Sequence, residues 1–157
     1  MTATATPGRT RTPDAVPREH GADFREFVAR VRADGLYRSA AHAEDVTRMV
    51  LACLGAQLTG DERVELAARL PREAAEALVS RAPGPRPLTG FGFVQDLAAR
   101  RGTGPGPARW DAGSVLRQVA RLAGPRLSER ILAGLPEGYA LLFGVAQLVP
   151  RNRVPVG

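Results

Sequence analysis

The chain contains no lysine, one cysteine and two histidines, and only 5% of its residues are aromatic. A single cysteine cannot form an internal disulfide. Neither His20 nor His42 has a second histidine or cysteine at the spacing that a metal site uses. We therefore expect a fold that packing alone stabilises, with no metal and no cofactor. The scarcity of aromatic residues also argues against the stacking surfaces of proteins that bind single-stranded nucleic acid.

Long hydrophobic runs are missing as well. No apolar stretch approaches the roughly 18–20 residues that a membrane-spanning helix needs, and residues 1–20 hold no hydrophobic segment like that of a secretory signal. We expect a cytoplasmic protein that does not associate with membranes. Residues 1–20, rich in Thr, Pro and Ala, are predicted to be a disordered tail, and residues 150–157 a second, C-terminal tail.

Two stretches of the chain, residues 43–71 and 112–136, repeat each other. A repeat of this kind predicts two similar helical units, each unable to bury its apolar face alone. The matched positions are Ala43, Val46, Val50, Leu66, Leu70 and Pro71 in the first stretch and Ala112, Val115, Val119, Ile131, Leu135 and Pro136 in the second.

Apolar residues recur at helical spacing, and no segment shows the alternating pattern of a strand. We predict an all-α fold: a tandem pseudo-repeat of two four-helix units forming one compact helical domain. The first unit covers residues 21–80 and the second residues 91–149. Residues 81–90, rich in Pro and Gly, form the linker between them.

Capping and helix-breaking residues set the expected boundaries of the helices. In the first unit, the first helix has an N-cap at Asp23 with Glu26 and a C-cap at Gly35, and the second covers residues 39–58. A capping box of Thr59 with Glu62 begins the third helix, and a fourth helix covers residues 72–80 after Pro71. In the second unit the signals are a loop over 101–109, an N-cap at Asp111 or Ser114, a break at Gly124-Pro125, and a last helix from Pro136 to Leu148.

With its recurring Leu-Pro turns the chain resembles a bacterial family, domain-of-unknown-function family 2267, small helical proteins built from two copies of such a unit. The resemblance covers roughly residues 23–145 and implies a fold but no activity. The residues that carry it are Phe27-Val28 with Gly35, residues 50–62 and residues 66–71, and in the second copy Phe93-Val94, Leu127-Ser128 and Leu135-Pro136 with Tyr139 and Phe143.

The residue types that catalysis needs do not converge in the sequence. Cys53 lies in an apolar run, which favours a small buried side chain over a reactive thiol. His42, near a helix start, fits a solvated or capping role better than a ligand or base. The glycine-rich loop over 102–106 follows no strand and lacks the Gly-Lys-Ser/Thr of a phosphate loop, so we interpret it as a connector. We expect no enzymatic activity.

Charge is divided unevenly between the two halves. Residues 21–80 hold eight arginines and ten acidic residues, a net charge of −2, whereas residues 81–157 hold eleven arginines and four acidic residues, a net charge of +7. The second half is therefore the candidate surface for a partner or a polyanion. The alternative is a solvated face, partly paired with acids of the first half. The residues concerned are Arg100, Arg101, Arg109, Trp110, Arg117, Arg121, Arg126 and Arg130.

Two residue groups favour a protein partner. Trp110 lies beside Arg109, where it either anchors a partner or covers the core. Residues 138–149 are apolar on nearly every face, which indicates a helix buried between the two units or, as the alternative, a homodimer interface. We predict a non-catalytic protein-interaction or scaffolding module that binds another protein. Binding of nucleic acid through the arginine-rich second half is the alternative function.

Overall fold

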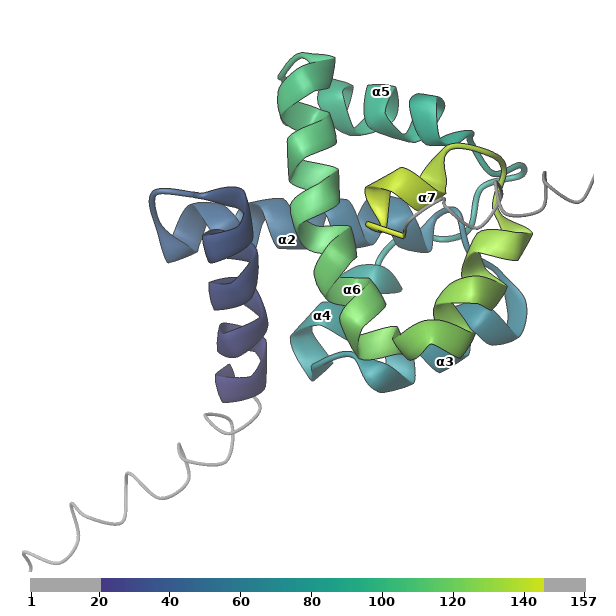
Figure 1. Ribbon diagram of the computed structural model, residues 1–157, viewed down its shortest axis with the longest axis horizontal. Helices are drawn as coiled ribbons and strands as arrows, with labels where there is room; N and C mark the ends of the chain where they lie inside the picture. The colour runs from purple at the N-terminus through teal and green to yellow at the C-terminus, as the bar shows by residue number, and fades with distance from the viewer. Residues whose placement is uncertain (1–20, 146–157) are drawn as a thin grey trace, which may run out of the picture.

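The computed structural model describes residues 21–145. The regular secondary structure in this range consists of helices, with no strand (Figure 1). The all-α prediction is confirmed for this range. Both predicted tails lie outside the described residues. The helices are an N-terminal helix over residues 21–35, α2 Ala40–Gly55, α3 Gly60–Arg69, α4 Arg72–Leu78, α5 Gly90–Arg101, α6 Pro105–Gly134 and α7 Tyr139–Leu142.

The N-terminal helix differs from its prediction at both ends. Residues 21–23 are already helical, so the N-cap predicted at Asp23 is wrong. Gly35 is the last helical residue rather than the C-cap, and the left-handed conformation falls on Leu36, with φ 57°. Gly35 is required for another reason: a Cβ there would overlap the Tyr37 ring and lie 2.7 Å from Ser114 Oγ. Close packing against Tyr37 and Ser114, rather than a left-handed turn at the helix end, therefore requires glycine at this position.

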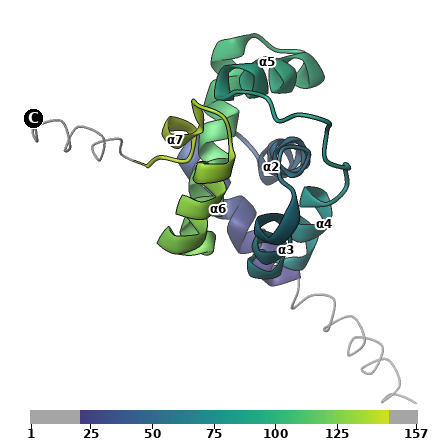
Figure 2. The ribbon, with the colours of Figure 1, turned by 90° about the vertical axis from the view of Figure 1, so that its right-hand side faces the viewer.

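The core is built around α2. Figure 2 looks along its axis and shows α4, α5 and α6 around it, and all three contact it. Its N-cap is Ser39, whose hydroxyl accepts the His42 N–H at 3.1 Å. The helix ends at Gly55, short of the predicted Leu58, and α4 packs so closely there that a Cβ on Gly55 would overlap the Leu78 carbonyl.

The next two helices begin where the sequence predicts. Thr59 is the N-cap residue of α3, but its side chain makes no capping hydrogen bond, so the reciprocal capping box does not form. Pro71 is the N-cap residue of α4. After α4 the chain is non-helical through residues 81–89, and hydrogen bonds attach this segment to the turn after α2 and to α7. These are Gly84 N–H to Ala56 O, Leu88 N–H to Gln57 Oε1, and Tyr139 O–H to Leu88 O.

The longest helix, α6, joins what the sequence predicts to be a loop and two helices. It begins at Pro105 after the N-cap residue Gly104, so the loop predicted over 101–109 is wrong from residue 105 onward. Proline is well suited to the first turn, since its missing N–H would have no partner there. The predicted caps Asp111 and Ser114 therefore lie inside the helix, and both are buried. The predicted break is present as a kink at Gly124, with φ 82° and ψ 165°.

The last helix is much shorter than predicted. Helix α7 covers Tyr139–Leu142 and packs on α6, and residues 146–149 of the predicted helix lie outside the described range. Its N-cap residue, Gly138, has φ 100° and lies against Gly90, where a Cβ would come within 2.5 Å of the Gly138 carbonyl. The predicted burial of this helix holds for Tyr139 and Leu142, which are 1% and 7% exposed, but not for Leu141, which is 74% exposed.

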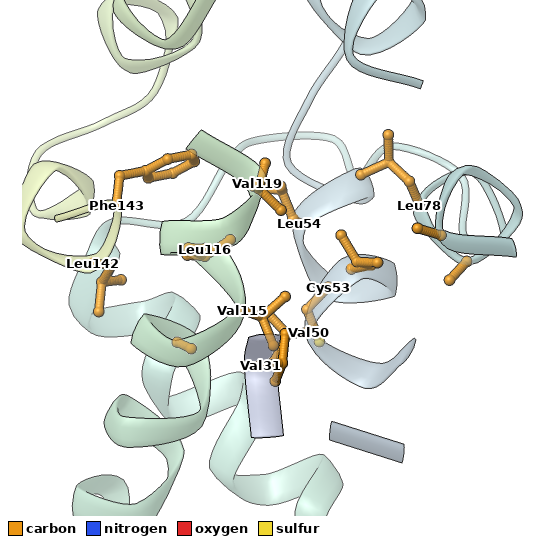
Figure 3. Close-up of a cluster of buried hydrophobic side chains, with 14 of the residues drawn as sticks. Val31, Val50, Cys53, Leu54, Leu78, Val115, Leu116, Val119, Leu142 and Phe143 are labelled. Atoms are coloured by element: carbon orange, nitrogen blue, oxygen red, sulfur yellow. The ribbon is translucent and has the colours of Figure 1, made fainter. Parts of the chain in front are cut away.

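One hydrophobic cluster contains buried residues from every helix. Figure 3 shows part of it: Val31 of the N-terminal helix and Val50 of α2 meet Val115 of α6, while Leu142 and Phe143 lie against the other side of α6. Within residues 21–145, no helix is long and apolar enough to cross a membrane.

Candidate functional site

The eight residues singled out from the sequence lie at the end of α5 and along α6, and they do not form one basic face. Each has its own surroundings, which separate them into structural ion pairs and exposed side chains. The structural ion pairs determine which part of the surface is left for a partner.

Arg101 belongs to a buried cluster. Its Nε–H donates to Asp111 Oδ2 at 2.9 Å, and the two side chains are only 14% and 7% exposed. The other carboxylate oxygen of Asp111 accepts the Tyr37 hydroxyl at 2.5 Å. Burial, together with this bond to a carboxylate, raises the pKa of Tyr37. The cluster connects the start of α6 to the end of α5 and to the turn after the N-terminal helix, so Arg101 is a structural residue.

A hydrogen bond holds one edge of the Trp110 ring, and much of the ring is exposed to solvent. Its indole Nε1–H donates to the Gly35 carbonyl at 2.9 Å, across the close approach that Gly35 permits, yet the side chain remains 53% exposed. The Ser114 hydroxyl donates to the Trp110 carbonyl one turn away. The ring is therefore held in one orientation while much of its surface faces solvent.

Arg100 is neutralised on its own helix. Its Nε–H donates to both carboxylate oxygens of Asp96, at 3.2 and 3.0 Å, and Asp96 raises the pKa of the guanidinium. Arg81 lies 4.0 Å from the same carboxylate and contacts the sulfur of Cys53. Cys53 is fully buried, as predicted, and burial together with Asp96 raises its pKa. These shifts disfavour the thiolate that a reactive cysteine needs.

Arg117 and Arg130 pair with acids of the first half. Arg117 lies 3.3 Å from Asp34, and its aliphatic stem covers Gly144, where a Cβ would lie 2.9 Å from Arg117 Cγ. Arg130 lies 3.3 Å from Glu62 and 2.8 Å from Glu65 on α3, and these carboxylates raise its pKa. Both arginines therefore help to join the two halves, as the alternative interpretation of the arginines expected.

The remaining three arginines are exposed. Arg121 donates to Gln118 Oε1 at 3.1 Å, and neither Arg109 nor Arg126 forms an ion pair with a residue in the described range. They lie far apart on α6: Arg109 in its second turn, Arg126 beyond the kink.

Trp110 lines a hollow of about 300 Å³ between the first turns of α6 and α7. Two large apolar side chains are exposed beside it, Trp110 at 53% and Leu141 at 74%. Arg109 and Arg117 are the charged residues of its lining. We call this surface the Trp110 patch; it consists of Gly106, Arg109, Trp110, Gly113, Arg117, Leu141 and Leu142.

Sequence reasoning missed Leu141 and Gly106. The uniformly apolar sequence around Leu141 pointed to burial, but in α7 Leu141 is exposed while Tyr139 and Leu142 are buried. Gly106 belonged to a predicted loop, but it lies in the first turn of α6, where it leaves open space. The described residues contain no group of three His, Cys, Asp or Glu side chains that could hold a metal ion.

A family model described as "Uncharacterized conserved protein (DUF2267)" matches residues 24–142. The chain belongs to the DUF2267 family. All seven residues of the Trp110 patch lie within the part that matches the DUF2267 model. No curated protein matches the chain.

Proposed function

We propose that this DUF2267 protein is a non-catalytic protein-interaction module and that the Trp110 patch is its contact surface. One observation carries the proposal: two exposed apolar side chains from different helices flank a hollow whose charged lining residues are arginines. Tryptophan and arginine are enriched among the residues that contribute most to protein–protein binding. Both surfaces favoured by the sequence, the basic second half and the apolar C-terminal helix, meet there.

The state of the tryptophan also supports the proposal. Because its indole N–H is bonded to the Gly35 carbonyl, the ring loses little conformational freedom when a partner covers it. Among the described residues, the buried pair of Arg101 and Asp111 connects α5 to α6, and Arg130 with Glu62 and Glu65 connects α6 to α3. This favours a binding role over a catalytic one.

A matched pair of variants tests the function. Leu141→Asp and Val64→Asp each place a carboxylate at an exposed apolar position, 74% and 70% exposed, one inside the patch and one on α3. Tagged full-length protein is purified from its native host, and co-purifying proteins are quantified. We expect a stoichiometric partner with the unmodified chain and with Val64→Asp, and its loss with Leu141→Asp. A partner that Leu141→Asp retains, or that Val64→Asp also loses, contradicts the assignment of the patch.

Nucleic-acid binding is the second candidate, and the three exposed arginines favour it: Arg109, Arg121 and Arg126. Arg117 and Arg130 are better left unchanged in a test, because they pair with acids of the first half. A mobility-shift titration of duplex DNA compares the unmodified chain with the triple glutamine variant across salt concentrations. Electrostatic binding weakens steeply with salt and is lost in the variant. Absence of binding at low salt contradicts this candidate.

We also propose that the two halves are duplicated four-helix units. The two Leu-Pro turns support this. Leu70 has φ −94° and ψ 156°, Leu135 has φ −98° and ψ 153°, and each donates its N–H to the carbonyl three residues before it. Their side chains are 8% and 9% exposed. Two equal turns at matched positions are the expected remnant of a duplicated scaffold.

A further inference from the structure

We propose that the Trp110 patch receives an acidic amphipathic helix of a partner protein, an inference that rests on the proposed function and names the chemistry of the partner. Four properties of the patch carry it: its charge, its length, its rigidity and the absence of a sheet edge. Together they specify a helix with an apolar anchor and acidic neighbours.

The charge of the patch calls for acidic residues. Its charged members are Arg109 and Arg117, and no acidic side chain lines the hollow. Arg117 already has one carboxylate partner, Asp34, whereas Arg109 forms no ion pair with any residue from 21 to 145. A carboxylate brought to the rim by a partner would therefore meet an arginine that is not yet paired. Complementary rim charges increase the rate and the selectivity of association.

The length of the patch fits about three helical turns. Gly106, Trp110, Gly113 and Arg117 follow one another at intervals of four, three and four residues, which is the spacing of one helix face. At 1.5 Å per residue this face extends over roughly 16 Å. Gly106 leaves open space in the first turn, and Leu141 of α7 stands at the side of the hollow. A partner helix laid along this face presents anchors at i, i+3 or i+4, and i+7.

The surroundings favour a helix over an extended peptide. Extended peptides commonly add to an exposed sheet edge, and residues 21–145 contain no strand. A hollow of about 300 Å³ lies at the lower limit for small-molecule pockets and suits an apolar side chain that anchors a larger ligand. The walls are fixed: Trp110 is bonded to Gly35, and Arg117 is held over Gly144 by its pairing with Asp34.

A display selection tests the inference. A library of 16-residue peptides with helical apolar spacing and randomised flanking positions is selected on the full-length protein, and the enriched peptides are afterwards tested against Leu141→Asp. We expect the enriched peptides to combine an apolar pair at i,i+4 with two or more neighbouring Asp or Glu residues. Replacing those acids by Asn and Gln, or placing a proline mid-peptide, should weaken binding on the order of tenfold, about 1.4 kcal/mol.

Two arginine variants serve as a matched pair. Arg109 and Arg126 are both exposed residues of α6 without an ion pair among the described residues, but only Arg109 belongs to the patch. Arg109→Glu should lose about tenfold in affinity for the selected peptides, Arg109→Lys should keep most of it, and Arg126→Glu should leave it unchanged. Since both side chains are exposed, none of these variants should alter the fold, which circular dichroism checks.

The outcomes separate this inference from the proposed function. Neutral or basic peptides that still require Leu141 overturn the acidic-helix inference and leave the contact surface in place. A failure to enrich any peptide that distinguishes the unmodified chain from Leu141→Asp overturns both. Binding of anionic lipid vesicles or duplex DNA that depends on Leu141, in the absence of peptide binding, overturns the assignment to a protein partner.

Discussion

Arginines stand at both ends of α6, but they have opposite surroundings. At the C-terminal end, Arg130 contacts Glu62 and Glu65 of α3. At the N-terminal end, Arg109 lies beside the exposed Trp110, with no ion-pair partner among the described residues. Arg130 uses its charge to join α6 to α3, whereas Arg109 presents its charge to solvent. The spacing of arginines along a helix does not distinguish the two cases, because the facing element decides them.

The same comparison applies to ion pairs within one end. The pair of Arg101 and Asp111 is buried, whereas the side chains of Arg117 and Asp34 are 43% and 35% exposed. Solvent screens the second pair, and such exposed pairs contribute about 0–1 kcal/mol to stability. Breaking a buried pair leaves an uncompensated charge and costs far more. The buried pair therefore fixes the N-terminal end of α6 to the rest of the fold, whereas the exposed pair contributes little to stability.

The largest expected effect is at the buried pair. Asp111→Ala leaves Arg101 without its carboxylate and Tyr37 without its acceptor, and we expect it to lower the free energy of unfolding by about 3–5 kcal/mol in urea titrations. Asp34→Ala removes the exposed carboxylate that pairs with Arg117 and accepts the Gln118 amide N–H, and should cost no more than about 1 kcal/mol. Equal losses of unfolding free energy in the two variants would contradict the greater importance of the buried pair for stability.

The two Leu-Pro turns provide a comparison between the halves. Leu70→Ala and Leu135→Ala should each lower the free energy of unfolding by about 2–5 kcal/mol, because both side chains are buried. Leu141→Ala, at an exposed position, should change it by less than about 0.5 kcal/mol. Chemical denaturation measures all three. A neutral Leu70 or Leu135 variant would argue against equivalent units.

The pH dependence tests the burial of the two tyrosines, Tyr37 and Tyr139. Burial raises the pKa of both Tyr37 and Tyr139 above the ordinary value of 10.0. Since the protonated form is favoured in the folded state, their contribution is complete below about pH 10 and is lost as the pH rises further. In an ultraviolet titration neither should ionise near pH 10 while the chain stays folded. Tyrosine ionisation near pH 10 without unfolding would contradict their burial.

The smallest effect concerns the C-terminal end of α6. Arg130→Gln should lower the melting temperature slightly at low salt, and the difference should disappear near 1 M salt, where screening extends to about 3 Å. Arg126→Gln removes an exposed arginine without an ion pair in the described range and should leave the melting temperature unchanged. Identical behaviour of the two variants at low salt would show that the ion pairs to α3 do not stabilise the fold.

Much of the fold could be predicted, because it depends on local signals. Periodic apolar residues fix the helices, and Gly124-Pro125 marks the kink. The errors arise where tertiary contacts override local preference. Asp111 has the chemistry of an N-cap, yet it lies buried inside α6 with Arg101 because the helix begins at Pro105. Gly35 has the chemistry of a C-cap but is required by its packing against Tyr37 and Ser114.

For the same reason, the sequence predicted only part of the Trp110 patch. Trp110 and Arg109 are conspicuous in the sequence, but nothing there indicates that Leu141, about thirty residues away, lies beside them. Nor does the sequence reveal which arginines face acids, because that depends on α3 lying against the C-terminal end of α6. Residue type suggested the chemistry of the surface, and tertiary structure determined its extent.

We propose that a partner binds the N-terminal end of α6, which carries the Trp110 patch, and not its C-terminal end. The most direct test of this proposal is the affinity of a selected acidic helical peptide for the unmodified chain, for Leu141→Asp and for Val64→Asp, measured by calorimetry. We predict that Leu141→Asp loses at least about tenfold in affinity while Val64→Asp equals the unmodified chain. Unchanged affinity in Leu141→Asp, or an equal loss in Val64→Asp, would contradict the account.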